Sequence, residues 1–288
     1  MKVLFVGVFT DNNKSTNDSQ ARAFEANGCE VVRYNYRIMK DMLGFENRDH
    51  HIAHTCKHEN IDLVVFSKCN GVNVRVIREC NKLAKTCLWF MDAFIPNHWS
   101  PELIQKIEAS TFVCCDKSQS TSAALHHNPN TYQVYEGFDD LIDKPHNLVR
   151  DIPISFIGDP YGERGTMCDV TGAMVFQNTY GEEHAKIVSR SYINLNMCTG
   201  NCASDRVYKI LGAGGLLFTT DWDGRRGQFQ DLGDLVIFKR EQDLKANIQR
   251  LIDDPDYADE IRSNGLKRVQ KYSRYNWAQE ILRLYENH

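Results

Sequence analysis

Residues 191–221 read SYINLNMCTGNCASDRVYKILGAGGLLFTTD, and this stretch decides the fold class. It predicts a strand over 191–197, a helix over 204–215 that ends in glycines, and a second strand over 216–221. Short, nearly continuous apolar strands are typical of a parallel sheet covered on both faces. A strand, a crossover helix and a second parallel strand make a βαβ unit, so the stretch predicts an α/β protein.

The same alternation of strands and helices runs along the rest of the chain. Apolar runs such as KVLFVGVF (2–9), IDLVVFS (61–67) and KTCLWFMD (85–92) predict a first parallel sheet. The pattern restarts at ISFIGD (154–159), after which a helix-poor stretch reaches 174–181. We therefore expect two Rossmann-like, doubly wound parallel-sheet domains that face a cleft, with loops at the carboxyl ends of the strands forming the ligand site.

The domain boundary is predicted in LIDKPHNLVRDIP (141–153), where Pro145 and Pro153 punctuate the chain. We expect a first domain over 1–147 and a second domain over 148–272. A terminal helix is expected over 273–288.

Composition narrows the function classes. The net charge of −4 argues against unspecific coating of nucleic acid by a basic surface. The ten cysteines are scattered, which favours reduced thiols over a disulfide framework. No apolar run is long enough to span a membrane, and an apolar strand follows Met1 directly. We therefore expect a cytoplasmic protein without an export segment, as a monomer or weak dimer.

The helix that begins near residue 204 is a candidate anion site. Ser204 or Asp205 suits the N-cap, so the first amides of the helix would point into the cleft. A helix amino terminus favours groups such as diphosphate, and Arg206 adds a guanidinium there. An ordinary N-cap with a solvated arginine is the alternative.

Several runs in the second half follow one another in a recognisable order. Over residues 152–288 this order resembles glycosyltransferases of the spore-protein CgeB-like, glycosyl-transferase-group-1 type, which have the two-Rossmann GT-B fold. Over 1–150 only the strand order and LWFMDAF fit. The runs are ISFIGDPYGER, TYG, YINLNM, SDRVYKILGAGGLLFTTDWDG and DLVIFKREQDLKANIQRLIDDPDYADEIRSNGLKRVQKYSRYNWAQEIL.

The resemblance implies transfer of a sugar from a nucleotide sugar, with UDP expected, to an acceptor hydroxyl. It implies that the first domain is the acceptor side and that the second domain binds the sugar nucleotide. It implies that the terminal helix crosses back to the first domain through Trp277 and its apolar neighbours. It also implies a set of donor-binding residues. These are Gly158 and Arg164 in a phosphate loop, Tyr180 and Gly181 near the base, Asn194 and Asn196 beneath the sugar, and Ser204, Asp205, Arg206, Tyr208 and Lys209 at the diphosphate helix.

One departure from the family pattern keeps other functions open. Retaining members of the wider superfamily carry two glutamates eight positions apart, and Asn201 and Lys209 stand at the matching positions. A lysine cannot accept hydrogen bonds from ribose hydroxyls. A non-catalytic sugar-nucleotide-binding protein and a sugar-nucleotide epimerase are therefore the alternatives to a transferase.

Candidate catalytic groups lie in the first half. Asp92 ends an apolar strand and is the first candidate for the base that deprotonates the acceptor; capping of the next turn is its alternative role. Asp18 is the second candidate. The polar loop TDNNKSTND contributes Asp11, Lys14 and Asn17 to the predicted acceptor site.

No metal or cofactor is predicted. Asp221-Trp222-Asp223 has the DxD form but is expected to be an acidic turn. The histidine run over 50–58 is expected to be a solvated helix face. Arg206, Arg164 and Lys209 can neutralise phosphate instead.

The acceptor stays open among DNA with hydroxymethylated bases, a glycan, a protein side chain and a small metabolite. DNA is considered because compact viral transferases of this fold act on such bases, which would place the protein in a host cytoplasm. A local basic rim would be formed by Lys14, Arg22, Lys68 and Arg75. Phe94 and Trp99 would stack an extruded base.

Overall fold

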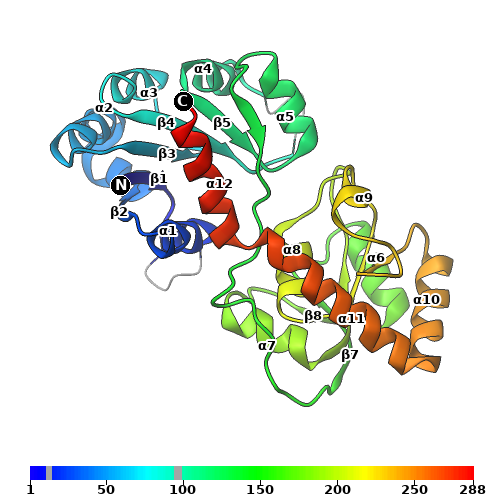
Figure 1. Cartoon of the computed structure of the whole chain (residues 1–288). Helices are drawn as coiled ribbons and strands as arrows, with labels where there is room; N and C mark the ends of the chain where they lie inside the picture. The colour runs from blue at the N-terminus through cyan, green and yellow to red at the C-terminus, as the bar shows by residue number, and fades with distance from the viewer. Residues whose placement is uncertain (11–14, 94–98) are drawn as a thin grey trace. The chain divides into compact units, whose positions relative to one another are not determined.

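The computed structural model describes residues 1–10, 15–93 and 99–288, so Asp11, Lys14 and Phe94 lie outside the described residues. The chain divides into two compact units. Unit 1 comprises Met1–Glu136 and Arg274–His288, and unit 2 comprises Gly137–Ser273. Each unit is a parallel sheet with helices packed on it (Figure 1), which confirms the predicted α/β class with two Rossmann-like domains.

Unit 1 contains a six-stranded parallel sheet in the order β2-β1-β3-β4-β5-β6. Its strands are β1 (Lys2–Gly7), β2 (Glu30–Asn35), β3 (Leu63–Ser67), β4 (Lys85–Phe90), β5 (Phe112–Cys115) and β6 (Thr131–Gln133). Its helices are α1 (Thr16–Ala26), α2 (Tyr36–His58), α3 (Val74–Cys80), α4 (Pro101–Ala109), α5 (Ser118–Leu125) and α12 (Arg274–Glu286).

The apolar strands of unit 1 are buried on both faces, as their sequences predict. In β1, Val3 and Phe5 belong to one core cluster, whereas Leu4 and Val6 belong to another. Successive side chains of a strand point to opposite faces, so one strand supports two cores. The first core also receives Trp277 of α12, whose ring lies 5.3 Å from those of Phe24 and Trp89. The terminal helix therefore packs on unit 1, as expected.

Helix α2 has a kink that the sequence does not announce. Gly44 interrupts the helix with φ +79° and ψ 171°, a conformation that glycine adopts without the steric penalty of a side chain. The helix restarts at Phe45. Its second segment lies beside α3, and its last turn leads to β3.

Unit 2 contains a five-stranded parallel sheet in the order β11-β10-β9-β7-β8. Its strands are β7 (Ile152–Ile157), β8 (Met174–Phe176), β9 (Ser191–Asn196), β10 (Leu217–Thr219) and β11 (Val236–Ile237). Its helices are α6 (Glu163–Thr171), α7 (Glu182–Arg190), α8 (Asp205–Gly212), α9 (Arg225–Gln228), α10 (Glu241–Asp253), α11 (Pro255–Val269) and the 3-10 turn η2 (Gln270–Tyr272).

Two expectations for unit 2 differ from the structure. The stretch expected to be helix-poor contains α6, because burial of Cys168 in the core outweighs the low helix propensity of Gly165 and the threonines. The boundary falls after Glu136 instead of after 147. Residues 137–147 bond within unit 2, since the Phe138 amide donates to the Tyr272 carbonyl at 3.1 Å.

Of the helices that the structure describes, none combines the length and the apolar character that crossing a bilayer requires.

Candidate functional site

The start of α8 lies at the carboxyl edge of the second sheet, after β9. Ser204 has the extended backbone of an N-cap residue, with φ −88° and ψ 160°. Its hydroxyl donates to Asn196 Oδ1 at 3.4 Å, and the Asn196 amide donates to Thr219 Oγ1 of β10 at 3.0 Å. These bonds hold the helix start against two neighbouring strands, which suits a preorganised anion site.

Arg206, in the first turn of α8, is held by the end of β7. Its Nη1 donates to the Ile157 carbonyl at 3.0 Å, and its guanidinium lies 5.6 Å from the centre of the Phe156 ring. Gly158 follows with φ +142°, and a Cβ there would stand 2.2 Å from Arg206 Nη1. Burial lowers the pKa of Arg206. A guanidinium that is costly to bury is stabilised by a bound anion.

Further cationic side chains lie near Arg206. Arg164, in the first turn of α6, donates from Nη2 to Thr199 Oγ1 at 2.7 Å, and its positive charge also lowers the pKa of Arg206. Lys209 lies one turn after Asp205 and donates to its carboxylate at 2.5 Å. The structure therefore brings Arg164, Arg206 and Lys209 together at this edge of unit 2, although Lys209 is already paired.

His184 is a buried residue of this region that the sequence analysis missed. It lies in α7, is 4% exposed, and neither ring nitrogen has a hydrogen-bond partner among the described residues. Burial, together with the positive charge of Lys209, lowers its pKa to about 3. The spacing of His184, Ile187 and Val188 in the sequence is the signal that could have placed it on the buried face of the helix.

The other predicted donor residues divide into buried and exposed ones. Asn194 is buried and accepts from Ser155 Oγ at 3.1 Å. Tyr208 is buried as well, and its hydroxyl accepts from Gln228 Nε2 at 3.1 Å. The structure thus gives these two side chains packing roles. Tyr180 is 53% exposed, and Gly181 is the N-cap residue of α7.

Asp92 lies just beyond the carboxyl end of β4 in unit 1, as predicted. Its carboxylate accepts from Lys68 Nζ at 2.5 Å, which joins the predicted base to a predicted acceptor residue. Its carbonyl accepts from Ser120 Oγ at 2.9 Å, so the backbone at this position is held. The Asp92 side chain is 54% exposed and accessible to a substrate. Trp99 packs edge-on against Phe90.

Asp18 and Asn17 are occupied by structural bonds. Asp18 Oδ2 accepts from Ser15 Oγ at 2.5 Å and from Thr10 Oγ1 at 3.0 Å, and it forms a capping box with Ser15. A buried carboxylate that is bonded in this way is poorly suited to deprotonate an acceptor. Asn17 accepts from Ser67 Oγ at 2.8 Å and so links α1 to β3.

The candidate metal sequences have other contacts. Asp221 accepts from Arg225 Nε at 2.6 Å and from the Trp222 amide at 2.9 Å. His54 and His58 stack along α2 with ring centres 3.9 Å apart. Over residues 1–10, 15–93 and 99–288, no three His, Cys, Asp or Glu side chains are grouped so that they could hold a metal ion.

Comparison with solved structures defines the class of the fold. Anabaena Alr3699/HepE, solved in complex with UDP, matches with a TM-score of 0.70 and 12% identity over 100% of both chains. A Rickettsia africae glycosyltransferase matches with 0.68 and 12%, over 99% of this chain and 98% of that one. An alpha-glucosyltransferase, solved with UDP-glucose and abasic-site DNA, matches with 0.68 and 8% over 99% of both. The fold is that of the GT-B class.

The family follows from the sequence of the second half. A family described as glycosyl transferase-like matches residues 140–284, about half of the chain. The chain belongs to this glycosyl transferase-like family. No curated protein matches it.

Proposed function

We propose that this protein is a glycosyltransferase that moves a sugar from a UDP-sugar to an acceptor hydroxyl. Family membership supports the reaction type. The UDP complex and the UDP-glucose complex of Alr3699/HepE support the choice of nucleotide. The observation that carries the proposal is the position of Arg206, fixed by the Ile157 carbonyl at the start of α8.

Transfer needs stabilisation of the leaving diphosphate and activation of the acceptor hydroxyl. Arg206 and Arg164, with the amino end of α8, would stabilise the developing negative charge, so we expect no metal or other cofactor to be needed. Asp92 would take the proton of the acceptor. The Lys68 ammonium would keep its carboxylate oriented.

The direct test of the donor site is UDP binding by an Arg206→Ala variant, measured by isothermal titration calorimetry. We expect the affinity to fall about 10- to 150-fold, which corresponds to a lost hydrogen bond to a charged group of about 1.5–3 kcal/mol. Arg250→Ala is the control, since Arg250 is exposed in the last turn of α10. Equal affinity in both variants would remove Arg206 from the donor site.

A second assay separates the transferase from the alternatives that Asn201 and Lys209 raise. The protein is incubated with a panel of sugar nucleotides and acceptors, with and without EDTA. Transfer, epimerised sugar and slow hydrolysis of the donor are scored separately. Binding of a sugar nucleotide without turnover with any acceptor would favour a non-catalytic binding protein. Formation of an epimerised sugar would favour a sugar-nucleotide epimerase.

The acceptor panel should include DNA with hydroxymethylated bases, because one structural relative was solved with DNA. Three residues of the predicted basic rim, Arg22, Lys68 and Arg75, lie in the part of the chain that the structure describes. The ammonium of Lys68 is already paired with the Asp92 carboxylate. A mass gain on the modified base, with salt-dependent binding of the duplex, is the result that would identify this acceptor.

A further inference from the structure

Unit 1 has a hollow of about 570 Å³ at the carboxyl edge of its sheet. Its walls come from the second segment of α2, the loop after β3, both turns of α3 and the amino-terminal half of α4. This volume lies within the range of about 300–1,000 Å³ that small-molecule sites usually have. The loop that forms one wall begins at Lys68, whose ammonium bonds to Asp92.

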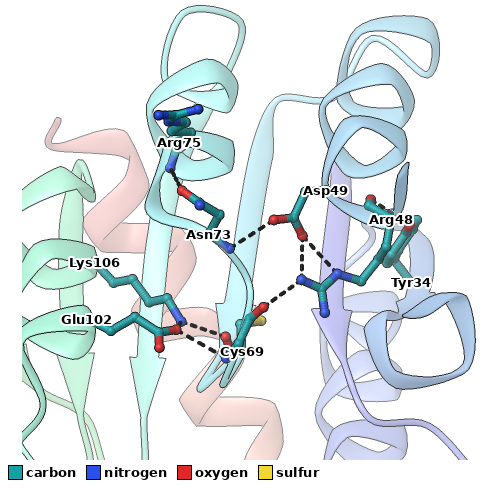
Figure 2. Close-up of polar contacts among 9 residues, drawn as sticks. Tyr34, Arg48, Asp49, Cys69, Asn73, Arg75, Glu102 and Lys106 are labelled. Carbon is teal, nitrogen blue, oxygen red and sulfur yellow. Dashed lines mark hydrogen bonds and ion pairs between the residues drawn. The ribbon is translucent and has the colours of Figure 1, made fainter. Parts of the chain in front are cut away.

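A buried arginine holds the α2 wall of this pocket. Arg48 is 1% exposed, and its Nη2 donates to Asp49 Oδ1 at 2.5 Å and to the Gly71 carbonyl at 2.6 Å. The other carboxylate oxygen of Asp49 accepts from the backbone N–H of Asn73 at 3.1 Å. Figure 2 shows these bonds converging on the loop between β3 and α3.

A buried lysine holds the opposite wall in the same way. Lys106 is 2% exposed, and its ammonium donates to Glu102 Oε1 at 2.5 Å and to the Cys69 carbonyl at 2.7 Å (Figure 2). Glu102 also accepts from the Gly71 amide at 3.1 Å. In each pair the cation is buried and the carboxylate is partly exposed, with Asp49 16% and Glu102 50% exposed. The two pairs fix the backbone of one loop, which suits a site that must be held in shape.

The charges that face the pocket are mostly negative. Asp49 and Glu102 are neutralised by the buried cations behind them, whereas Glu46 and Glu79 have no ion pair among the described residues. Arg75 is the cation on the lining. Phe45, 61% exposed, adds an aromatic face. A phosphate-rich ligand would meet carboxylates here, and like charges repel at such distances.

We infer that this pocket binds the acceptor of the proposed transfer and that the acceptor is a neutral saccharide. Ionised carboxylates only accept hydrogen bonds, and the hydroxyls of a sugar can donate to Glu46 and Glu79. Arg75 donates to sugar oxygens, and the ring of Phe45 covers the apolar face of a pyranose. The inference rests on the proposed function in one respect, namely that the bound saccharide is the acceptor of the transfer. Binding of the saccharide itself does not require the donor.

The test measures binding to the whole chain without donor. Saturation-transfer difference NMR is recorded with glucose, galactose, mannose, N-acetylglucosamine and their common disaccharides, and a duplex that carries hydroxymethylcytosine is titrated in parallel. The variants are Glu46→Gln, Glu79→Gln and Phe45→Ala. Glu286→Gln on α12 is the matched control, since Glu286 is an exposed carboxylate outside the pocket.

We expect at least one sugar to bind, with affinity reduced about tenfold by Glu79→Gln, as for a lost hydrogen bond to a charged group, and unchanged by Glu286→Gln. No response from any sugar, or equal binding by all variants, would overturn the inference. Binding of the duplex that the pocket variants leave unchanged would also overturn it. UDP titration of the same samples shows separately whether the donor site fails.

Discussion

The carboxyl edges of the two sheets have opposite electrostatic character. In unit 2, Arg206 and Arg164 lie at the start of α8 and α6, and the half-buried guanidinium of Arg206 is tied to a backbone carbonyl. In unit 1, the buried cations Arg48 and Lys106 lie behind carboxylates that line the pocket. The same fold thus places arginine side chains at one edge and a pocket lined by carboxylates at the other.

This difference suggests a division of labour between the units. Cations in front suit a diphosphate, whose charge they neutralise. Carboxylates that line a pocket, with buried cations on their far side, can accept hydrogen bonds from a polyol and repel an anion. Variants of unit 1 and variants of unit 2 should therefore affect different measurements.

The largest effect is expected for Asp92→Asn. An amide cannot take the acceptor proton, so turnover should fall about 10²- to 10⁴-fold, the usual contribution of a general base. UDP affinity should stay within about twofold of that of the parent protein, because Asp92 lies in unit 1 and the proposed UDP site lies in unit 2. Steady-state kinetics and calorimetry on the same sample check both parts. Turnover close to that of the parent would make Asp92 structural.

Arg48→Met should cause the next largest effect, on stability. The variant leaves Asp49 without its buried counter-ion and the Gly71 carbonyl without a donor. Loss of one partner of a buried pair typically costs about 3–5 kcal/mol in the free energy of unfolding. Urea unfolding measures the change. Arg78→Met on the exposed side of α3 is the control, with a change within about 0.5 kcal/mol; similar values for both variants would contradict the role of Arg48.

Gly158→Ala tests how tightly unit 2 holds Arg206. A Cβ would stand 2.2 Å from Arg206 Nη1, and φ +142° is unfavourable for alanine. We expect a loss of about 1–3 kcal/mol in stability and a fall in UDP affinity that is not additive with that of Arg206→Ala. Gly227→Ala, where a Cβ meets nothing within 4 Å, is the control. Additive losses of UDP affinity would show that the two residues act separately.

Much of the architecture could be predicted from the sequence, because short, nearly continuous apolar runs that alternate with helices indicate a parallel sheet covered on both faces. The start of α8 could also be predicted, because its signal is local: the N-cap residue Ser204 and Arg206 are near neighbours in the chain. The role of Asp18 was missed although the signal is local. Ser15 and Asp18 have the spacing of a capping box, which explains the carboxylate without catalysis.

The pocket of unit 1 could not be predicted in this way. Arg48, Gly71 and Lys106 come from different crossover units and meet only when the sheet forms. A long cationic side chain in a helix is normally solvated, so nothing in the local sequence indicates that Arg48 and Lys106 are buried. The histidine run was expected to be a solvated helix face, and the sequence did not indicate that His50 lines the pocket.

The smallest effect concerns His184 and the pH dependence of stability. Its pKa is about 3 in the folded chain and about 6.5 when unfolded, so the unfolded state binds a proton between these values and the folded state does not. Stability from this group is complete above pH 6.5 and is lost as the pH falls toward 3. The expected loss is about 1.4 kcal/mol between pH 7.5 and 5.5, measured by urea unfolding.

His184→Leu should remove that part of the pH dependence, whatever it does to stability at pH 7.5, because leucine does not titrate. His126→Leu, at an exposed position, should leave the pH dependence as it is. The result also bears on the comparison of the two edges, since Lys209 and Arg206 help to keep His184 uncharged. If His184→Leu shows the same loss between pH 7.5 and 5.5 as the parent, then His184 is already solvated or paired in the folded protein. The cationic character assigned to the region around α8 would then be weaker than its contacts indicate.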